Sequence, residues 1–466
     1  MGLAVLLFVA SSHGAQPSKE VPAEEILQRI QAGQPVEYDN VTIVGDLNVS
    51  GLKLPTVHVG RTWLEKSDLH LTDDSKSIAS VITVTNSLIR GSIDFKGATL
   101  QKEVNLSGTE ILGEAHFSGA RFNQSAYFFN SQFNQSVYFS FSRFNQFADF
   151  LDSRFNGSAD FLDSQFDQSA QFSSWFRKSA IFMGSQFNQS VGFWYSRFNG
   201  SADFLGSQFD QSADFSYSRF NQGAEFTDSQ FNQSADFEYS QFNGSANFLD
   251  LQFNGESHFE DVHFLYANFR DSRFSKEAFF DDSKINETLY FYRTKYDKLN
   301  IRWSSIHDLA YDDTSYYLLI ENFKKQGFFD DANECYYSYR CKHGWELLRQ
   351  GKIFNWFFDS LAWGTYGYGL QPWQPLGWSV CFIVLGGFFF WRSKGIIRKE
   401  DDSKDVSIWE AFLLSATYYT SGASAIISTT PMEFTPQGRA RYVVVLLRLS
   451  GWIFFVLFLA SLTRIV

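Results

Sequence analysis

The chain has 466 residues and a formal net charge of −12, from 39 basic and 51 acidic residues. Non-specific electrostatic binding of nucleic acid needs a basic face, so the negative net charge argues against a nucleic-acid partner. The composition is also unusual, because 53 residues are Phe while only 8 are Pro and 3 are Met. A structural unit that recurs many times, rather than one site, must require this much Phe.

Residues 1–15 are predicted to be a signal peptide. Leu3 to Ala10 is almost wholly apolar, and Ser11 to Ala15 supplies the small residues of a cleavage zone. The apolar run is too short to span a bilayer. No basic residue precedes it, so an upstream start codon and a chance apolar terminus stay open as alternatives.

Residues 16–80 are predicted to cap the domain that follows. Ile43, Val49 and Leu54 are spaced by five or six and are expected to form an outlying half-coil. A polar insertion over 55–80 separates them from the main repeat. Terminal coils of a repeat array need such caps, which stop end-to-end addition.

Residues 81–302 contain the repeat, in which large residues step alternately by five and six and so recur with a period of eleven. From Val84 to Ile301 there are 41 such positions, and Phe occupies 33 of them. A small or apolar residue precedes most of them by two, as Ala126 precedes Phe128. Because this period is neither that of a helix nor that of a flat strand, it predicts a chain that winds round a narrow core and stacks each turn on the last.

The middle of the repeat supplies the predicted core ladder, whose large side chains all point inward. Each buried Phe contributes about 1.5 to 3 kcal/mol relative to an exposed one, and only a continuous stack buries its neighbours on both sides. The ladder residues are Phe150, Phe155, Phe161, Phe166, Phe198, Phe204, Phe209, Phe215, Phe220, Phe226, Phe231 and Phe237.

Units such as residues 158–168, which read Ser-Ala-Asp-Phe-Leu-Asp-Ser-Gln-Phe-Asp-Gln, resemble the pentapeptide-repeat family in its A-x-F-x-x-S-x-F form. The resemblance implies a mainly β fold class, namely a right-handed quadrilateral β-helix with four faces in each coil. The spacing then gives about ten coils. A single step of four, from Phe172 to Phe176, predicts a tightened corner or a bend.

Outward positions of the repeat carry acids on one set of faces and Arg or Gln on the other. Two interpretations stay open: a stripe that binds a cation or a partner, and a solvated surface whose charges pair across the corners. The acids are Asp149, Asp160, Asp203, Asp214, Glu225 and Asp236, and the others are Arg143, Arg154, Gln165, Arg197, Arg219 and Gln230.

No enzymatic activity is predicted, because the chain has no nucleophile elbow, phosphate loop or zinc spacing, and a Phe-filled rod offers no cleft. His258 and His263 fall on adjacent faces without a third His or a Cys, so no metal site and no cofactor are expected. Cys335, Cys341 and Cys381 are too few for a disulfide framework and are expected to be free thiols.

Residues 303–370 are predicted to form a helical neck. A first helix is expected over 313–325, opened by Asp313 or Thr314, and a second over about 330–350. The stretch after them is crowded with aromatic residues, which is typical of a segment at the membrane interface. Thr365 to Gly369 resembles a potassium filter by eye, but it precedes the first apolar helix and is predicted to lie at the interface.

Residues 371–466 are predicted to form a two-transmembrane module, so the lipid bilayer is an expected partner and the chain an expected multi-pass protein of the cell membrane. The spans are expected at about 376–391 and 442–462. The second contains Arg448, which is costly in a membrane unless it snorkels, pairs or faces a polar interior.

The segment between the spans, Ile408 to Ile427, resembles the pore loop of two-transmembrane potassium channels. The resemblance implies a re-entrant helix followed by filter-like positions: Thr420, Ser421, Gly422, Ala423 and Ser424. The motif is degenerate, because Ala423 and Ser424 replace the Tyr and the second Gly of the filter. Filter carbonyls that line one axis require backbone angles that a residue with a Cβ tolerates poorly, which argues against potassium selectivity.

The connection 392–441 holds seven basic residues, whereas 355–375 holds none. By the positive-inside rule, this connection is cytoplasmic and the repeat domain lies on the exported side.

These features predict a membrane-anchored, non-enzymatic scaffold or binding protein, with an unidentified protein or surface ligand as partner. The alternative is a subunit of a potassium-channel-like protein with a β-helical assembly or gating domain, which would be a homo-tetramer. A third interpretation is an acidic rod that mimics DNA, as gyrase-inhibiting relatives are thought to do, although the interleaved Arg residues weaken it.

Overall fold

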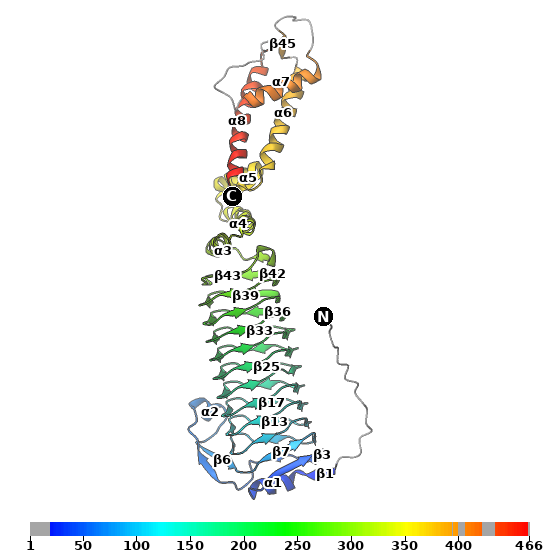
Figure 1. The fold of residues 1–466 in the computed structure, drawn as a ribbon, viewed down its shortest axis with the longest axis vertical. Coiled ribbons are helices and arrows are strands. Elements are labelled where there is room, and N and C mark those ends of the chain that lie inside the picture. Colours follow the sequence, from blue (N-terminus) through cyan, green and yellow to red (C-terminus); the bar gives the residue numbers. More distant parts are fainter. Residues whose placement is uncertain (1–18, 394, 399–405, 422–433, 465–466) are drawn as a thin grey trace. The chain divides into compact units, whose positions relative to one another are not determined.

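The computed structural model describes residues 19–393, 395–398, 406–421 and 434–464 (Figure 1). The chain divides into two compact units, Met1–Ser315 and Tyr316–Val466. The first is a β-solenoid of about 13 turns, and the second is helical. The solenoid and the C-terminal helical region predicted from the sequence are therefore confirmed.

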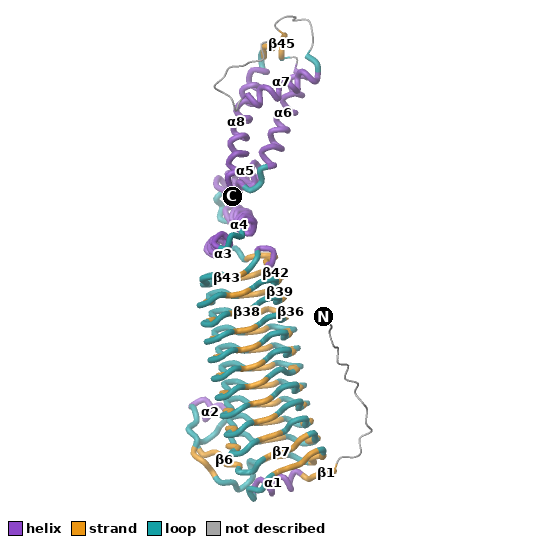
Figure 2. The backbone as a smooth tube through the Cα atoms, in the orientation of Figure 1, coloured by secondary structure: helices purple, strands orange, loops and turns teal. Residues whose placement is uncertain are grey.

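One turn of the solenoid holds four short strands joined by tight corners. Figure 2 shows the strands alternating with loops along the stack. All strands from β10 (Thr99–Leu100) to β35 (Ala235–Asp236) are two residues long. The turn that starts at β14 (Arg121–Phe122) continues through β15 (Ala126–Tyr127), β16 (Gln132–Phe133) and β17 (Val137–Tyr138) to β18 (Arg143–Phe144). β14 pairs in parallel with β18, so that Phe122 lies opposite Phe144 in the next turn.

The core consists of columns of Phe rings, one ring from each turn. Phe204 stacks face to face on Phe182 at 5.0 Å and on Phe226 at 4.9 Å, measured between ring centroids. It also meets Phe193 and Phe215 edge to face, each at 5.3 Å. The repeat of the parallel strands sets the vertical spacing, and the edge-to-face contacts fill the space between columns.

Buried serines explain the S-x-F half of the repeat, which the sequence pattern did not. The hydroxyl of Ser207 donates a hydrogen bond of 2.6 Å to the carbonyl of Phe182, and that of Ser185 one of 2.7 Å to the carbonyl of Phe161. The position has room only for a small residue, and a hydroxyl buried there needs an acceptor, which the Phe carbonyl provides. Ser meets both demands.

The expectation of about ten coils was wrong, because residues 19–48 extend the stack. Strands β2 (Val36–Asp39), β3 (Val41–Val44) and β4 (Leu47–Asn48) pair in parallel with β7 (Ile82–Thr85), β8 (Leu88–Ile89) and β9 (Ile93–Asp94). A further strand, β1 (Lys19–Pro22), pairs with β3. Ile43 and Val49 are thus buried core residues of a turn that pairs with the main stack, rather than of an outlying half-coil. The helix α1 (Ala23–Gln31) lies beside these strands (Figure 1).

The polar insertion is partly structured. It contains β5 (Thr56–His58), the short helix α2 (Trp63–Asp68) and β6 (Asp74–Ile78). β6 pairs with β10 through Ser77 and Ile78, so the stack resumes at Ser77 rather than after Ser80. The buried Arg61 fastens the insertion by donating to Glu65 and to the carbonyls of Gly97 and Gly119 at 2.8 to 3.0 Å.

The step of four produces a tightened corner and no break in the ladders. Three residues, Phe172, Ser173 and Ser174, join β23 (Ala170–Gln171) to β24 (Trp175–Phe176). β24 still pairs in register with the strands below and above it.

Near the C-terminal end of the solenoid some strands run through a corner. These are β36 (Gln241–Asn247), β39 (His263–Asn268) and β42 (Lys284–Tyr290), and the last of them pairs with β44 (Ile306–Leu309). A short 3-10 helix, η1 (Trp303–Ser305), precedes β44.

The helical unit begins with the expected neck. Helices α3 (Asp313–Lys325) and α4 (Phe329–Arg349) confirm the two predicted neck helices, and Asp312 caps the first by accepting from the Ser315 amide at 2.8 Å. A third neck helix, α5 (Ile353–Tyr366), was not predicted, and the 3-10 turn η2 (Gly367–Gly369) follows it.

The remaining elements are α6 (Trp373–Ser393), α7 (Ile408–Ser421) and α8 (Ala440–Arg464). An antiparallel pair that the sequence did not predict, β45 (Ile396–Arg398) with β46 (Phe434–Pro436), joins the two sides of the connection.

Candidate functional site

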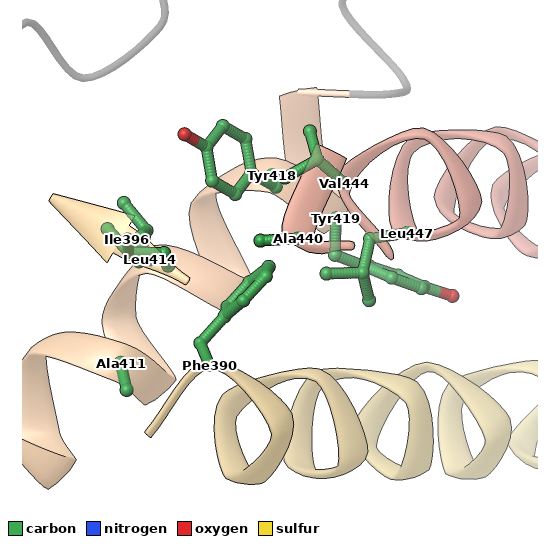
Figure 3. Packing of buried hydrophobic residues seen from close by; sticks show 9 residues of the cluster. All are labelled: Phe390, Ile396, Ala411, Leu414, Tyr418, Tyr419, Ala440, Val444 and Leu447. Atoms are coloured by element: carbon green, nitrogen blue, oxygen red, sulfur yellow. The ribbon is translucent and has the colours of Figure 1, made fainter. Parts of the chain in front are cut away.

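Helices α6, α7 and α8 pack into one module with a common apolar core. Figure 3 shows the nine buried residues that form it, among which the Phe390 and Tyr418 rings meet edge to face at 6.1 Å. They are Phe390, Ile396, Ala411, Leu414, Tyr418, Tyr419, Ala440, Val444 and Leu447. The short helix α7 is thereby held between the two long helices.

Three glycines permit this close packing. A Cβ at Gly386 would lie 2.9 Å from the Leu447 side chain, and one at Gly387 would lie 2.7 Å from the Phe412 ring. A Cβ at Gly451 would overlap the backbone carbonyl of Tyr419. Small residues at helix crossings are the usual device for packing helices in a membrane.

Arg448 lies half-buried on α8, next to Tyr418 of α7. Its guanidinium carbon lies 5.6 Å from the centroid of the Tyr418 ring, close enough for a cation–π interaction. Within the described parts of the chain, neither the Arg448 Nε nor the Tyr418 hydroxyl has a hydrogen-bond partner. The cation therefore rests on an aromatic face instead of a carboxylate.

The filter-like positions are described only in part. Thr420 and Ser421 lie in the last turn of α7, where their hydroxyls each donate at 2.9 Å to backbone carbonyls of the same helix, those of Ala416 and Tyr418. Gly422, Ala423 and Ser424 lie outside the described residues, as does the segment 1–15 predicted as a signal peptide.

Both long helices expose most of their apolar surface. α6 and residues 440–463 of α8 are long and apolar enough to cross a membrane, and only 22% and 28% of their apolar windows are buried. Each helix is longer than the span expected from the sequence. Large exposed side chains include Val380 and Leu385 on α6 and Leu446 and Leu449 on α8. A core helix of a water-soluble protein would bury such residues.

A buried polar cluster joins α4, α5 and η2. The Asp359 carboxylate, with a side chain only 5% exposed, forms an ion pair with Arg340 and accepts a hydrogen bond of 2.7 Å from the Tyr368 hydroxyl. The Arg340 guanidinium lies 4.5 Å from the Tyr368 ring centroid. Burial, followed by the hydrogen bond to Asp359, raises the pKa of Tyr368 well above its ordinary value.

The structure buries Tyr368 among protein side chains, with only 3% of the residue exposed. Sequence reasoning missed the cluster because its three residues come from three separate elements. The one available signal was the flanking glycines: Gly367 and Gly369 have positive φ, and Tyr368 itself has a φ of 58°. That backbone turns the ring back towards Arg340 and Asp359.

A pocket of about 430 Å³ lies next to this cluster. Asp359 and Tyr368 border it, and Trp345, Trp356 and Trp363 supply aromatic walls. The Trp363 indole donates a hydrogen bond of 3.0 Å to the Tyr337 hydroxyl. The volume falls in the usual range of small-molecule pockets.

Phe rings fill the core of the solenoid over residues 117–280. The twelve Phe residues of the predicted core ladder are all at most 1% exposed, because the rings above and below cover each one.

One group of potential metal ligands lies on an outer face. Ligand atoms of Glu238, His258 and Glu260 all lie within 4.8 Å of one another. His258 Nδ1 is 3.2 Å from a Glu260 carboxylate oxygen, and the imidazole ring stacks on Phe279 at 5.0 Å. The ring therefore already has polar and aromatic partners. Sequence reasoning considered His258 with His263 and missed the two acids.

The outward-facing Arg and acidic side chains of the repeat fit neither the binding-stripe interpretation nor the charge-pairing interpretation at every position. Arg143 pairs with Asp167 of the adjacent turn at 2.8 Å, as the pairing interpretation expects. By contrast, Arg154, Arg197 and Arg219 form no ion pair with a carboxylate in the part of the chain that the structure describes.

The acids of these faces are partly shielded from water. Burial raises the pKa values of Asp149 and Asp236 above their ordinary range. Both carboxylates also accept a local backbone N–H, which opposes that shift.

The three cysteines are free thiols, as predicted. Cys335 is buried in α4, and burial raises the pKa of its thiol well above the ordinary value. Such a thiol is a poor nucleophile at neutral pH.

Residues 85–132, 175–219 and 215–263 match the family model described as pentapeptide repeats (9 copies). The match supports the resemblance seen in the repeat, and it does not extend to the C-terminal helices. No curated protein and no solved structure matches the chain. The resemblance of α6, α7 and α8 to a channel pore thus has no support from the comparisons.

Proposed function

We propose that the protein is a membrane-anchored, non-enzymatic scaffold that presents a pentapeptide-repeat solenoid for binding. The carrying observation is the exposure of α6 and α8, whose apolar windows are only 22% and 28% buried. Lipid is the environment in which this surface is stable.

In this proposal α7 re-enters the membrane beside the two spanning helices. It has 14 residues, which is too short to cross a bilayer, yet its inner face is packed against both long helices. The Arg448–Tyr418 contact supports the same arrangement, because an aromatic face offsets part of the cost of a cation in lipid.

Helix α5 acts as an interfacial anchor. Its exposed side chains include Phe354 at 83%, Phe358 at 65% and Ile353 at 62%. Aromatic residues beside a spanning helix are typical of the headgroup region. The basic connection 392–441 keeps that side of the module in the cytoplasm, and the solenoid is exported.

The solenoid in this proposal is a right-handed quadrilateral β-helix. The four strands in each turn support the quadrilateral form. Its closed Phe core supports a binding role over an enzymatic one, since ligands can meet only the outer faces and corners.

A cleavable variant of the full chain tests the proposal. A specific protease site inserted between Ala310 and Tyr311, at the start of the neck, allows the solenoid to be cut from the helices. We expect protease added to intact cells to release the solenoid into the medium while the helical fragment stays in the membrane pellet. Release of both fragments would contradict the anchor, and cleavage only after lysis would contradict export.

A further inference from the structure

The rod carries one basic face, although the chain as a whole is acidic. Arg154, Trp175, Arg197 and Arg219 occupy the same outward position in four consecutive turns, where each lies opposite the next in the parallel ladder. The corner that follows Trp175 adds Arg177 and Lys178, and all six side chains are exposed. We call these six residues the Arg–Trp face.

The cations of the Arg–Trp face have no acidic partner. Across the described ranges, none of its four arginines and its one lysine forms an ion pair. Elsewhere on the same solenoid, arginines are paired: Arg29 with Glu25, Arg90 with Glu20 and Arg143 with Asp167. The face therefore concentrates five uncompensated charges in a chain whose net charge is −12.

Trp175 orders two of the guanidinium groups. The ring is 46% exposed and lies between Arg154 and Arg197, whose guanidinium carbons are 5.6 Å and 4.7 Å from its centroid. Stacking uses the flat faces of guanidinium and indole and leaves the N–H edges of the guanidinium free. Those edges match the two oxygens of a carboxylate.

A ridge of aromatic side chains runs beside the Arg–Trp face. Tyr195, Tyr217 and Tyr239 stack in successive turns at 4.7 Å and 4.8 Å and are 57%, 46% and 45% exposed. Trp194 meets Tyr195 edge to face at 5.7 Å. The ridge begins at Tyr195. The corresponding corner of the turn before it, at Ser173 and Ser174, is one residue shorter and lacks the positive-φ residue that Asp152 and Tyr195 supply in the turns on either side.

We infer that the Arg–Trp face and the tyrosine ridge together form the docking surface for an acidic segment of a partner protein. Exposed Trp, Tyr and Arg are the residue types that dominate protein–protein interfaces. This assignment deepens the proposed scaffold function, on which it rests, by naming the face and the class of partner.

The geometry favours a narrow partner over a broad polyanion. Beyond the corner at Arg177 and Lys178, the next face carries Asp160, Asp203 and Glu225 in corresponding positions. These acids would repel the flanks of a nucleic-acid duplex or of an anionic membrane. From Arg154 to Arg219 the row is about 14 Å long, the length of four or five extended residues.

The test measures binding of a fluorescent glutamate-rich peptide to the full chain in detergent micelles, by anisotropy at low and at physiological salt. The variant Arg154→Gln/Arg197→Gln/Arg219→Gln is compared with Arg29→Gln/Arg90→Gln/Arg143→Gln, which removes the same charge from arginines that have acidic partners. We expect the first variant to weaken binding about tenfold or more and the second to change it less than about twofold.

Equal affinity of the two variants would overturn the inference. Tighter binding of single-stranded DNA or of anionic vesicles than of the peptide would overturn the class of partner. Should the triple variant fail to fold by circular dichroism, Arg177→Gln/Lys178→Gln serves instead, because both residues lie at an exposed corner. Retention of each chain in the membrane pellet is measured in parallel. A variant that loses peptide binding but stays in the pellet separates the docking face from the anchor. If the unaltered chain stays in the pellet but does not bind the peptide, the docking inference fails and the anchor proposal stands.

Discussion

The inward Phe is the residue on which the solenoid depends. Each ring is covered by the turn below and the turn above, so a single side chain stabilises three turns at once. Phe204 shows this arrangement, with face-to-face neighbours at 5.0 Å and 4.9 Å and no exposed surface.

Replacing Phe204 by Asp should unfold the middle of the stack. The change removes a buried ring and leaves a charge with no partner, at a cost of about 4 kcal/mol or more. The matched change Asp203→Lys affects an outward side chain that accepts a hydrogen bond from the Leu205 amide. Its loss should lower the free energy of unfolding by less than about 1 kcal/mol. Thermal unfolding of the full chain, followed by circular dichroism, compares them; equal melting would disprove the inward assignment.

Backbone conformation also constrains the corners, where glycines and some other residues, such as Tyr217 and Asp228, have positive φ. Gly206 has a φ of 65°, and a Cβ there would meet nothing within 4 Å. Gly206→Ala should therefore destabilise the protein by about 1 kcal/mol through backbone strain alone. Gly60→Ala, equally open in space but without a positive φ, is the control and should change the melting temperature little. A neutral Gly206→Ala would show that the corner is not left-handed.

Spacing alone predicted the inward Phe residues, because the alternation of five and six forces one large side chain into each face. It did not predict the serine hydroxyls that reach the carbonyls of Phe182 and Phe161, since an Ala and a Ser are equally small in a sequence pattern. Nor did it reveal that Arg154 and Arg197 lack acidic partners, because pairing depends on which side chains adjacent turns bring together.

At the scale of elements, a buried polar cluster holds α5 against α4 in the neck. Removing the Asp359 carboxylate leaves the Arg340 charge and the Tyr368 hydroxyl without their partner. Asp359→Ala should cost about 3 kcal/mol and loosen α5 from α4. Glu321→Ala breaks the exposed pair with Lys324 and should cost less than about 0.5 kcal/mol. Hydrogen exchange of α5 in detergent distinguishes them, and unchanged protection in Asp359→Ala would refute the structural role of the cluster.

The contact between α7 and α8 depends on Gly451. Gly451→Leu places side-chain atoms against the Tyr419 carbonyl and should lower the stability of the module by about 2 kcal/mol or more. Gly377→Leu adds the same atoms on α6 where a Cβ meets nothing within 4 Å. Melting in detergent micelles provides the measurement; similar losses in both variants would mean that α7 does not pack on α8 as described.

Helix caps and apolar length predicted α3, α4, α6 and α8, which are all local signals. The helix α5 and the pair β45–β46 were not predicted. α5 is stabilised by residues brought from α4 and η2, and β45 pairs with a strand more than thirty residues away. Long-range contacts of this kind leave no period in the sequence.

At the scale of the whole molecule, the number of turns was underestimated because the first turns lack the Phe pattern. Val21, Ile26 and Ile43 fill the core there, and the insertion between β4 and β6 interrupts the spacing. A solenoid gains stability from each added neighbour, so these aliphatic turns act as an integral cap on the Phe stack.

The two units divide the proposed work between binding and anchoring. The solenoid contributes its outer faces, among them the Arg–Trp face with its five uncompensated positive charges. The helical unit contributes two helices that are long and apolar enough to cross a membrane.

Alkaline carbonate extraction of membranes from cells that express the full chain tests the anchoring claim most directly. High pH strips proteins that are held on membranes by charge and leaves those whose helices are embedded in lipid. The chain should remain in the membrane pellet and require detergent for release. Recovery of the folded chain in the soluble fraction would contradict the account, because α6 and α8 would then be covered by protein rather than by a bilayer.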